Sequence, residues 1–295
     1  MPGPIPLFDR ALHRRRLDRA APGYADFLKR RAADDMVFRL EAIMRRFPVA
    51  VDLGARNGAF AGALAASDAR EKIDLLIETD LSALMLARGD VGLVADEERL
   101  PFKPDSLDLV VSSLALHWTN DLVGALIQAR LALKPDGLFI GALFGGATLT
   151  ELRQSLLSAE AELSGGASMR VSPFADASDA GGLLQRAGFA LPVADVDRIT
   201  VRYAHPVELL RDLRAMGETN VLLERSPLTR KVLGRALELY AEQFTEADGR
   251  VRATFEIITV TGWSPHESQQ KPLPRGSAKM RLADALGTTE HRIGD

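Results

Sequence analysis

The chain has 295 residues, of which 46% are hydrophobic and 26% charged, and it contains no cysteine. This composition is typical of a globular protein with a sizeable core, and it excludes disulfides, thiolate metal sites and a cysteine nucleophile. The net charge of −3 argues against a dedicated nucleic-acid-binding protein. No apolar run reaches the roughly 18 residues that span a bilayer, so we expect a cytoplasmic protein.

Residues 1–48 are expected to form a helical segment. Apolar residues recur there at helical spacing, Pro22-Gly23 separates two helices, and Pro48 is expected to end the second one. The segment is basic, and five of its arginines lie close together in the sequence: Arg10, Arg14, Arg15, Arg16 and Arg19. Such a cluster is typical of a solvated helix face, and the alternative is a helix that docks on an acidic partner.

Residues 49–263 are expected to form an α/β domain. Short apolar runs bounded by turn residues predict strands at 49–53, 75–78, 91–94, 107–112 and 138–144, with helices between them at 59–66, 83–87, 121–133 and 149–163. Strands that alternate with helices indicate a parallel sheet covered on both faces. Strands at 196–203 and 254–263 would complete a doubly wound, mostly parallel seven-stranded sheet, with a helical cap at about 204–250 inserted before the last strand. A polar tail over 264–295 follows.

The first expected strand runs into a turn that contains glycine, VDLGARNGAF. Gly54 and Gly58 lack a Cβ, so a ligand could closely approach the backbone N–H groups at the start of the next helix. The turn is not the dinucleotide fingerprint, because Arg56 stands where G-x-G-x-x-G requires its second glycine. Taken alone, the turn is as consistent with an ordinary tight connection as with a ligand-binding loop.

Carboxylates follow the next two expected strands. Asp80 comes at the distance from the glycine turn at which a carboxylate accepts hydrogen bonds from ribose hydroxyls, and Asp96 could accept from an adenine amino group. Asp80 could instead cap the helix that we expect after it. Acidic strand ends beside a glycine turn indicate an adenosine site at the edge of an open sheet. Such a site requires Asp80 and Asp96 to lie close together, and the space between them to be free of Arg56.

Several segments resemble a known superfamily. VDLGARNGAF, TDLSALMLARG, ADEERLPFKPDSLDLVVSSLALHWTNDLVGAL and LALKPDGLFI are similar to successive motifs of class I S-adenosylmethionine-dependent methyltransferases, whose fold is Rossmann-like. The flanking segments FDRALHRRRLDRAA, LLRDLRAMGETN and TGWSPHESQQKPLPRGSAKMRLADAL resemble the complex I (NADH:ubiquinone oxidoreductase) assembly factor 5 family. That family is itself similar to the malonyl-carrier-protein methyltransferases of biotin synthesis. The resemblance covers nearly the whole chain.

The resemblance implies a set of cofactor-binding residues. It places Asp52 and Gly54 by the methionine end of S-adenosylmethionine, Asp80 on the ribose, Asp96 on the adenine and Ser113 near the sulfonium. The same motifs contribute Gly58, Leu81 and Glu97. The chain departs from the pattern at Ala55-Arg56, where these enzymes usually have Cys-Gly or Ala-Gly. The Arg56 guanidinium would either pair with the methionine carboxylate or point to solvent, and we expect solvent.

The reaction itself is less well indicated. His117 could act as a general base near the methyl group, and the alternative is that His117 and Trp118 form a packing pair. The five histidines form no facial triad, so no metal site is predicted.

The resemblance implies an S-adenosylmethionine-dependent methyltransferase that modifies a protein side chain in respiratory complex I assembly, with a complex I subunit as its protein substrate. The alternatives are an arginine hydroxylase on the same fold, a non-catalytic assembly chaperone, and an O-methyltransferase of carrier-linked acyl groups. For a eukaryotic source, the resemblance implies the mitochondrial matrix. We expect at most a peripheral membrane contact and no nucleic-acid partner, and the sequence does not indicate an oligomeric state.

Overall fold

The computed structural model describes residues 6–86, 91–166, 168–270, 277 and 280–288. The chain divides into two units, Met1–Pro265 and His266–Asp295. The first unit contains the sheet and all helices except α9 (Leu282–Leu286), which lies in the second. None of the helices in the described ranges is long and apolar enough to cross a membrane.

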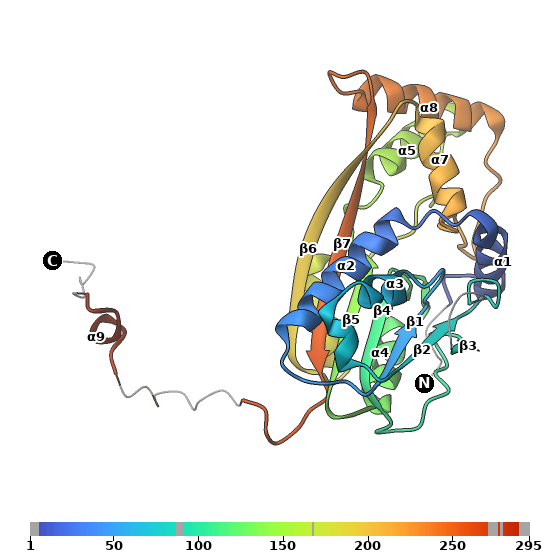
Figure 1. Ribbon diagram of the computed structural model, residues 1–295. Coiled ribbons are helices and arrows are strands. Elements are labelled where there is room, and N and C mark those ends of the chain that lie inside the picture. Colours follow the sequence, from blue (N-terminus) through green and yellow to red (C-terminus); the bar gives the residue numbers. More distant parts are fainter. Residues whose placement is uncertain (1–5, 87–90, 167, 271–276, 278–279, 289–295) are drawn as a thin grey trace. The chain divides into compact units, whose positions relative to one another are not determined.

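The first unit is built on a seven-stranded sheet in the order β3-β2-β1-β4-β5-β7-β6. The strands β1 to β5 are parallel, and β7 is antiparallel to both of its neighbours, β5 and β6 (Figure 1). This arrangement confirms the predicted doubly wound, mostly parallel fold. The strand bounds are β1 Val49–Leu53, β2 Leu75–Asp80, β3 Gly92–Val94, β4 Leu107–Ser113, β5 Leu133–Phe144, β6 Ala190–Tyr203 and β7 Val251–Trp263.

Two apolar clusters cover the two faces of this sheet. On one face, the buried side chains come from α2 (Phe27–Ala42), α3 (Ala59–Ala65) and the helices of the cap. On the other face, they come from α4 (Leu122–Ala132) and α6 (Ala177–Arg186). Because both faces of the sheet are covered, the central strand β4 is buried along its whole length.

The cap consists of α5 (Thr150–Ser164), α7 (Pro206–Ala215) and α8 (Arg230–Phe244), which lie together at one end of the sheet (Figure 1). The insertion predicted before the last strand is therefore present, since α7 and α8 lie between β6 and β7. The long strand β6 forms the edge of the sheet beside β7. Two of its carboxylates pair with α2: Asp195 with Arg39 at 2.7 Å and Asp197 with Arg31 at 2.6 Å.

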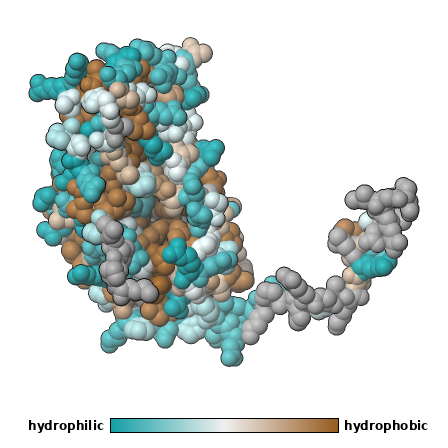
Figure 2. Space-filling view, turned by 180° about the vertical axis from the view of Figure 1, so that it is seen from behind, coloured by the Kyte–Doolittle hydropathy of each residue, from teal (hydrophilic) through white to brown (hydrophobic). Residues whose placement is uncertain are grey.

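Seen from behind, the first unit shows hydrophobic residues gathered along the middle of the face, with hydrophilic residues around them (Figure 2). Its surface includes large hydrophobic side chains that are about half exposed, among them Met169, Leu223 and Leu228. Scattered exposed hydrophobic residues are ordinary, whereas a continuous group of them is typical of a contact surface.

Two details of the sequence prediction are wrong. The second N-terminal helix, α2, ends at Ala42 rather than at Pro48, and Met44 beyond it is almost fully exposed. The helix predicted at 83–87 is a turn over residues 83–86, closed by a bond from Leu86 N to Ala83 O of 3.3 Å. Residue 87 lies outside the described residues. The described residues also form three short 3₁₀ helices: η1 (Ala21–Gly23), η2 (Asp68–Lys72) and η3 (Leu116–Trp118).

Candidate functional site

The turn after β1 depends on its glycines. Gly54 has φ +71°, and a Cβ built there would lie 2.3 Å from the Cβ of Ala115. Gly58 has φ +74° at the start of α3, where a Cβ would lie 3.0 Å from Glu78 Oε1. Both positions therefore require glycine, for its conformation and for the close approach of neighbouring atoms.

Asp80 ends β2 and is completely buried. One of its oxygens, Oδ2, accepts from the backbone N–H of Arg56 at 2.9 Å and from Arg56 Nη1 at 2.7 Å. The other, Oδ1, accepts from the N–H of Ser82 at 2.8 Å. Asp80 thus caps a turn rather than the helix that the alternative interpretation expected, and it also binds a guanidinium.

Arg56 contradicts its sequence prediction, because its side chain is fully buried instead of pointing to solvent. Its backbone has φ +55°, and its guanidinium lies against Asp80, with Nη1 3.9 Å from Glu97 Oε1. The Nε and Nη2 atoms of Arg56 have no hydrogen-bond partner within the described ranges. The neighbouring carboxylates offset part of the cost of burying this charge.

Two carboxylates, Asp96 and Glu97, follow β3. Arg10 of α1 (Arg10–Ala20) contacts both of them. Arg10 Nη2 pairs with Asp96 Oδ1 at 2.7 Å and also with Glu97. The helix α1 is held over this edge by a bond from Ser82 Oγ to Asp18 of 2.5 Å. Leu81 belongs to the same contact, in a small apolar cluster with α1 residues. The basic N-terminal helix is therefore docked on the chain's own acidic strand ends.

These contacts bring the predicted acids together but fill the space among them. Asp80, Arg56, Glu97, Arg10 and Asp96 form one connected series of opposite charges. The requirement that Asp80 and Asp96 lie near each other is met. The requirement that Arg56 leave the space between them free is not met in this structure, so a nucleoside could bind there only if the two guanidinium groups moved.

Lys29 of α2 is a site residue that the sequence analysis missed. Its ammonium donates to Gly54 O at 2.7 Å, to Ser113 Oγ at 2.8 Å and to Ser113 O, so it joins the ends of β1 and β4. Burial lowers the pKa of Lys29 to about 8. The sequence did hold an indication that Lys29 is buried, because it lies at helical spacing among the apolar residues on the buried face of α2.

Asp52 lies beside this ammonium at the end of β1. It is completely buried, and neither of its carboxylate oxygens has a hydrogen-bond partner in the part of the chain that the structure describes. Burial raises the pKa of Asp52 to about 7, against the attraction of Lys29. An unpartnered buried carboxylate is costly, so this position is suited to receive a donor or a cation.

His117 is packed among aromatic rings, with its ring centroid 5.3 Å from that of Trp118 and 4.8 Å from that of Phe144. Its Nε2 lies 3.0 Å from Glu218 Oε2, which also accepts from Trp118 Nε1 at 2.7 Å. The packing interpretation thus describes His117 well, and a role as a base stays a prediction. Sequence reasoning missed Glu218, which lies 101 residues further along the chain.

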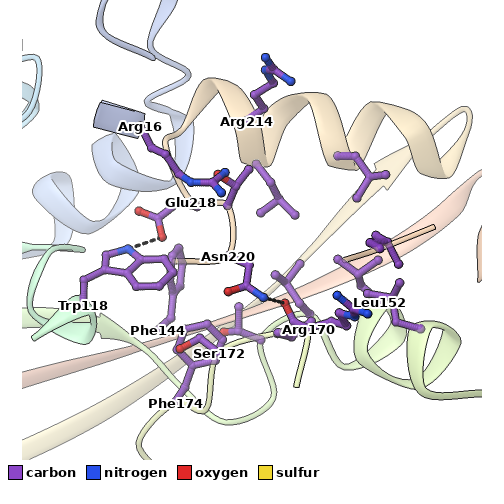
Figure 3. A pocket seen from close by; sticks show the side chains of 18 of the residues that line it. Arg16, Trp118, Phe144, Leu152, Arg170, Ser172, Phe174, Arg214, Glu218 and Asn220 are labelled. Atoms are coloured by element: carbon purple, nitrogen blue, oxygen red, sulfur yellow. Dashed lines mark hydrogen bonds between the residues drawn. The ribbon is translucent and has the colours of Figure 1, made fainter. Parts of the chain in front are cut away.

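Trp118 and Glu218 also line a cavity of about 380 Å³ between the sheet and the cap. Figure 3 shows Trp118, Phe144 and Phe174 on one side of it, and Arg16 reaching from α1 toward Glu218. The described ranges contain no group of three or more His, Asp or Glu residues that could hold a metal ion.

Comparisons with known proteins show the family of this chain. Residues 51–141 match the family model described as "Methyltransferase domain". The chain is 42% identical to the human protein named "Arginine-hydroxylase NDUFAF5, mitochondrial" over 294 residues, which cover 96% of this chain and 84% of the human protein. The chain belongs to the NDUFAF5 family.

This member of the NDUFAF5 family is also similar to proteins named as methyltransferases. The chain is 33% identical to "Malonyl-[acyl-carrier protein] O-methyltransferase" of Halorhodospira halophila, over 95% of this chain and 96% of that protein. Its fold is similar to the crystal structure of a "putative methyltransferase" from Bacillus halodurans, with a TM-score of 0.54, 16% identity, and coverage of 79% of this chain and 99% of that one. Both the family resemblance and the methyltransferase fold expected from the sequence are therefore confirmed.

Proposed function

We propose that this protein is an S-adenosylmethionine-binding enzyme that modifies a protein side chain during the assembly of respiratory complex I. The main support is the set of carboxylates at the ends of β1, β2 and β3, namely Asp52, Asp80 and Asp96, in a chain of the NDUFAF5 family. Open α/β sheets bind ligands at the carboxyl ends of their strands. When bound, S-adenosylmethionine would supply a methyl group activated on a sulfonium.

The chain's own residues would bind and orient this cofactor. Asp80 would accept from the ribose hydroxyls, and Asp96 with Glu97 from the adenine end. Gly54 leaves room for close approach at the turn, and Ser113 with Lys29 lies at the adjoining end of β4. Asp52 has two unpartnered oxygens for a donor or a positive charge, as far as the described residues go.

Binding would require an exchange of partners, because Arg56 and Arg10 now neutralise these acids. The ligand's hydroxyl and amino donors would replace the two guanidinium groups. Such an exchange has a cost, since it breaks buried ion pairs. We therefore propose that the unmodified protein binds the cofactor more weakly than a chain with glycine at position 56 would.

The test is calorimetric titration with S-adenosylhomocysteine. We expect measurable binding by the wild-type protein and loss of at least tenfold in affinity on Asp80→Asn, an exchange that keeps the size of the side chain. The matched control is Asp74→Asn, since Asp74 is exposed in the loop before β2 and should leave binding unchanged. Absence of binding at millimolar ligand, for the wild type and for Arg56→Gly alike, would contradict the proposal.

The transferred group is tested by intact-mass measurement and peptide mapping of an arginine-bearing complex I subunit, with and without this protein. A gain of one methylene supports methyl transfer. A gain of one oxygen supports the hydroxylation that the human relative's name describes. Methyl esterification of a carrier-linked acyl group, suggested by the name of the Halorhodospira relative, is tested by the same mass measurement on a carrier protein.

A second candidate function is a non-catalytic assembly chaperone, and the filling of the nucleoside space by Arg56 and Arg10 favours it. The two functions are separated by deleting the gene and restoring it as the Asp80→Asn variant. Recovery of complex I by this variant would support the chaperone, and failure to recover would support the enzyme. For either function we propose a location in the bacterial cytoplasm, or in the mitochondrial matrix of a eukaryote.

A further inference from the structure

The cavity between the sheet and the cap has an apolar floor. Its volume of about 380 Å³ lies in the range of small-molecule sites. The floor is formed by side chains from the end of β5, from α5 and α7, and from the segment before α6: Phe144, Leu149, Leu152, Leu156, Phe174 and Leu213. Figure 3 shows Phe144, Leu152 and Phe174 around the cavity. The acids at the strand ends do not line it.

Arginines gather around this apolar floor. Arg16 of α1 and Arg225 line the cavity. Figure 3 shows Arg16 reaching toward it from α1, whereas the guanidinium of Arg214 on α7 points away from the other labelled side chains. The pKa of Arg16 is lowered, first by burial and then by the charges of Arg19, Arg225 and Arg214. Like charges therefore lie near one another here, which is unfavourable unless an anion joins them.

Internal partners neutralise these arginines only in part. Arg16 bonds to the Thr219 hydroxyl, its Nε is buried without a partner, and no carboxylate in the described ranges lies within ion-pair distance of it. Arg225 has Asp9 at 3.7 Å. By contrast, the charge of another arginine on the cavity, Arg170, is neutralised by its ion pair with Glu160.

Among the described residues, Glu218 is the one carboxylate that lines the cavity, and its Oε2 accepts from the N–H of Trp118 and contacts His117 Nε2. It is not an ion-pair partner of the arginines, as far as the described residues go. The cavity therefore combines an apolar floor with a surplus of positive charge, which is unsuited to a cationic ligand and complementary to an anionic one.

We propose that this cavity binds an amphipathic anion, with a carboxylate or phosphate head at Arg16 and Arg225 and a linear apolar chain on the floor. The site is separate from the acids at the strand ends. It goes beyond the proposed function, because it needs neither the cofactor nor its carboxylates.

The probes are dodecanoate and dodecyl phosphate, each below its micellar concentration. Acetate and inorganic phosphate test the binding of the anionic head groups without an alkyl chain. Dodecyltrimethylammonium tests the same dodecyl chain with a positively charged head group. Trp118 lines the cavity, and the chain has only two tryptophans. The variant Trp263→Phe therefore gives Trp118 fluorescence as the readout, and calorimetry on the wild-type protein gives the affinity.

We expect both dodecyl anions to bind with micromolar affinity, the cationic probe at least tenfold more weakly, and the heads alone at least a hundredfold more weakly. The double variant Arg16→Gln/Arg225→Gln should weaken the binding of both anions about tenfold or more. Leu152→Trp, which fills the floor, should weaken them as well. The matched control is Arg211→Gln, since Arg211 is exposed on α7 and does not line the cavity.

Tighter binding of dodecanoate would identify a fatty-acyl source of the ligand, and tighter binding of dodecyl phosphate a phospholipid source. The proposal is overturned if neither anion binds, or if the cationic probe binds as tightly as the anions. It is also overturned if the double glutamine variant, with unchanged thermal unfolding, binds the anions as the wild type does.

Discussion

Replacing Arg56 with glycine should lower the stability of the free protein and raise its affinity for S-adenosylhomocysteine. Arg56 and Asp80 are both completely buried, and their ion pair measures 2.7 Å between Nη1 and Oδ2. Removing one member of a buried pair costs about 3–5 kcal/mol, because the other charge is left without a partner. Glycine adopts φ +55° without strain, and this relief stabilises the folded variant by about 1 kcal/mol. We therefore expect Arg56→Gly to unfold about 2–4 kcal/mol more easily than the wild type.

The same change should favour the ligand. In the wild type, a nucleoside must displace the guanidinium from Asp80, whereas in the variant its ribose hydroxyls meet a carboxylate without a partner. If about 1.4–2.8 kcal/mol of the lost pair is regained on binding, the affinity for S-adenosylhomocysteine rises about tenfold to a hundredfold. Calorimetric titration measures the affinity, and urea unfolding measures the stability.

The control for this experiment is Asp105→Gly. Asp105 also has a left-handed backbone, with φ +53°, but it is exposed and lies in the loop before β4. It reports the effect of a new glycine without touching the acid cluster, and its ligand affinity should equal that of the wild type. If a folded Arg56→Gly variant binds S-adenosylhomocysteine no better than the wild type, Arg56 does not compete with the ligand and our reasoning is refuted.

Two further predictions concern the turn after β1 and the acid at its end. Gly54→Ala places a Cβ 2.3 Å from the Cβ of Ala115 in a left-handed conformation, so we expect a loss of about 2 kcal/mol or more in urea unfolding, and near-wild-type stability would show that the turn yields easily. For Asp52, a pKa raised to about 7 in the folded state means that folding binds protons between about pH 4 and 7, so its contribution to stability falls as the pH rises through that window. From pH 5 to pH 7 this fall should amount to about 2–3 kcal/mol in the wild type and be largely absent in Asp52→Asn; parallel pH profiles of the two proteins would contradict the assignment. Lys29, with its pKa lowered to about 8, does not interfere below pH 7, because it stays protonated in both states there.

The sequence predicted the position of the site because the relevant patterns are local. Apolar runs mark the strands, and an acid directly after a run must lie at its carboxyl end. The order of residues alone therefore assigns Asp80 and Asp96 to one edge of the sheet. The glycines of the first turn were likewise recognisable, since their spacing from the strand fixes where the chain must reverse.

The contents of the site could not be predicted in the same way. The direction of the Arg56 side chain depends on two carboxylates 24 and 41 residues further along the chain, and no periodicity links these positions. Lys29 and Arg10 reach the site from helices that precede the first strand, so only the packing of those helices brings them there. The helix expected at 83–87 was misjudged because its apolar spacing suits a helix, while Asp80 and Ser82 close a tight turn instead.

The charged residues along β6 have a consequence for handling the protein in solution. An outermost strand of 14 residues offers a row of backbone donors and acceptors to any other chain that meets it. Along this strand, Asp195, Asp197, Arg198 and Arg202 each form an ion pair that keeps their charges at the surface. A foreign strand could add here only by stripping water from those groups. The pattern should therefore keep concentrated protein from stacking edge to edge into fibrillar aggregates.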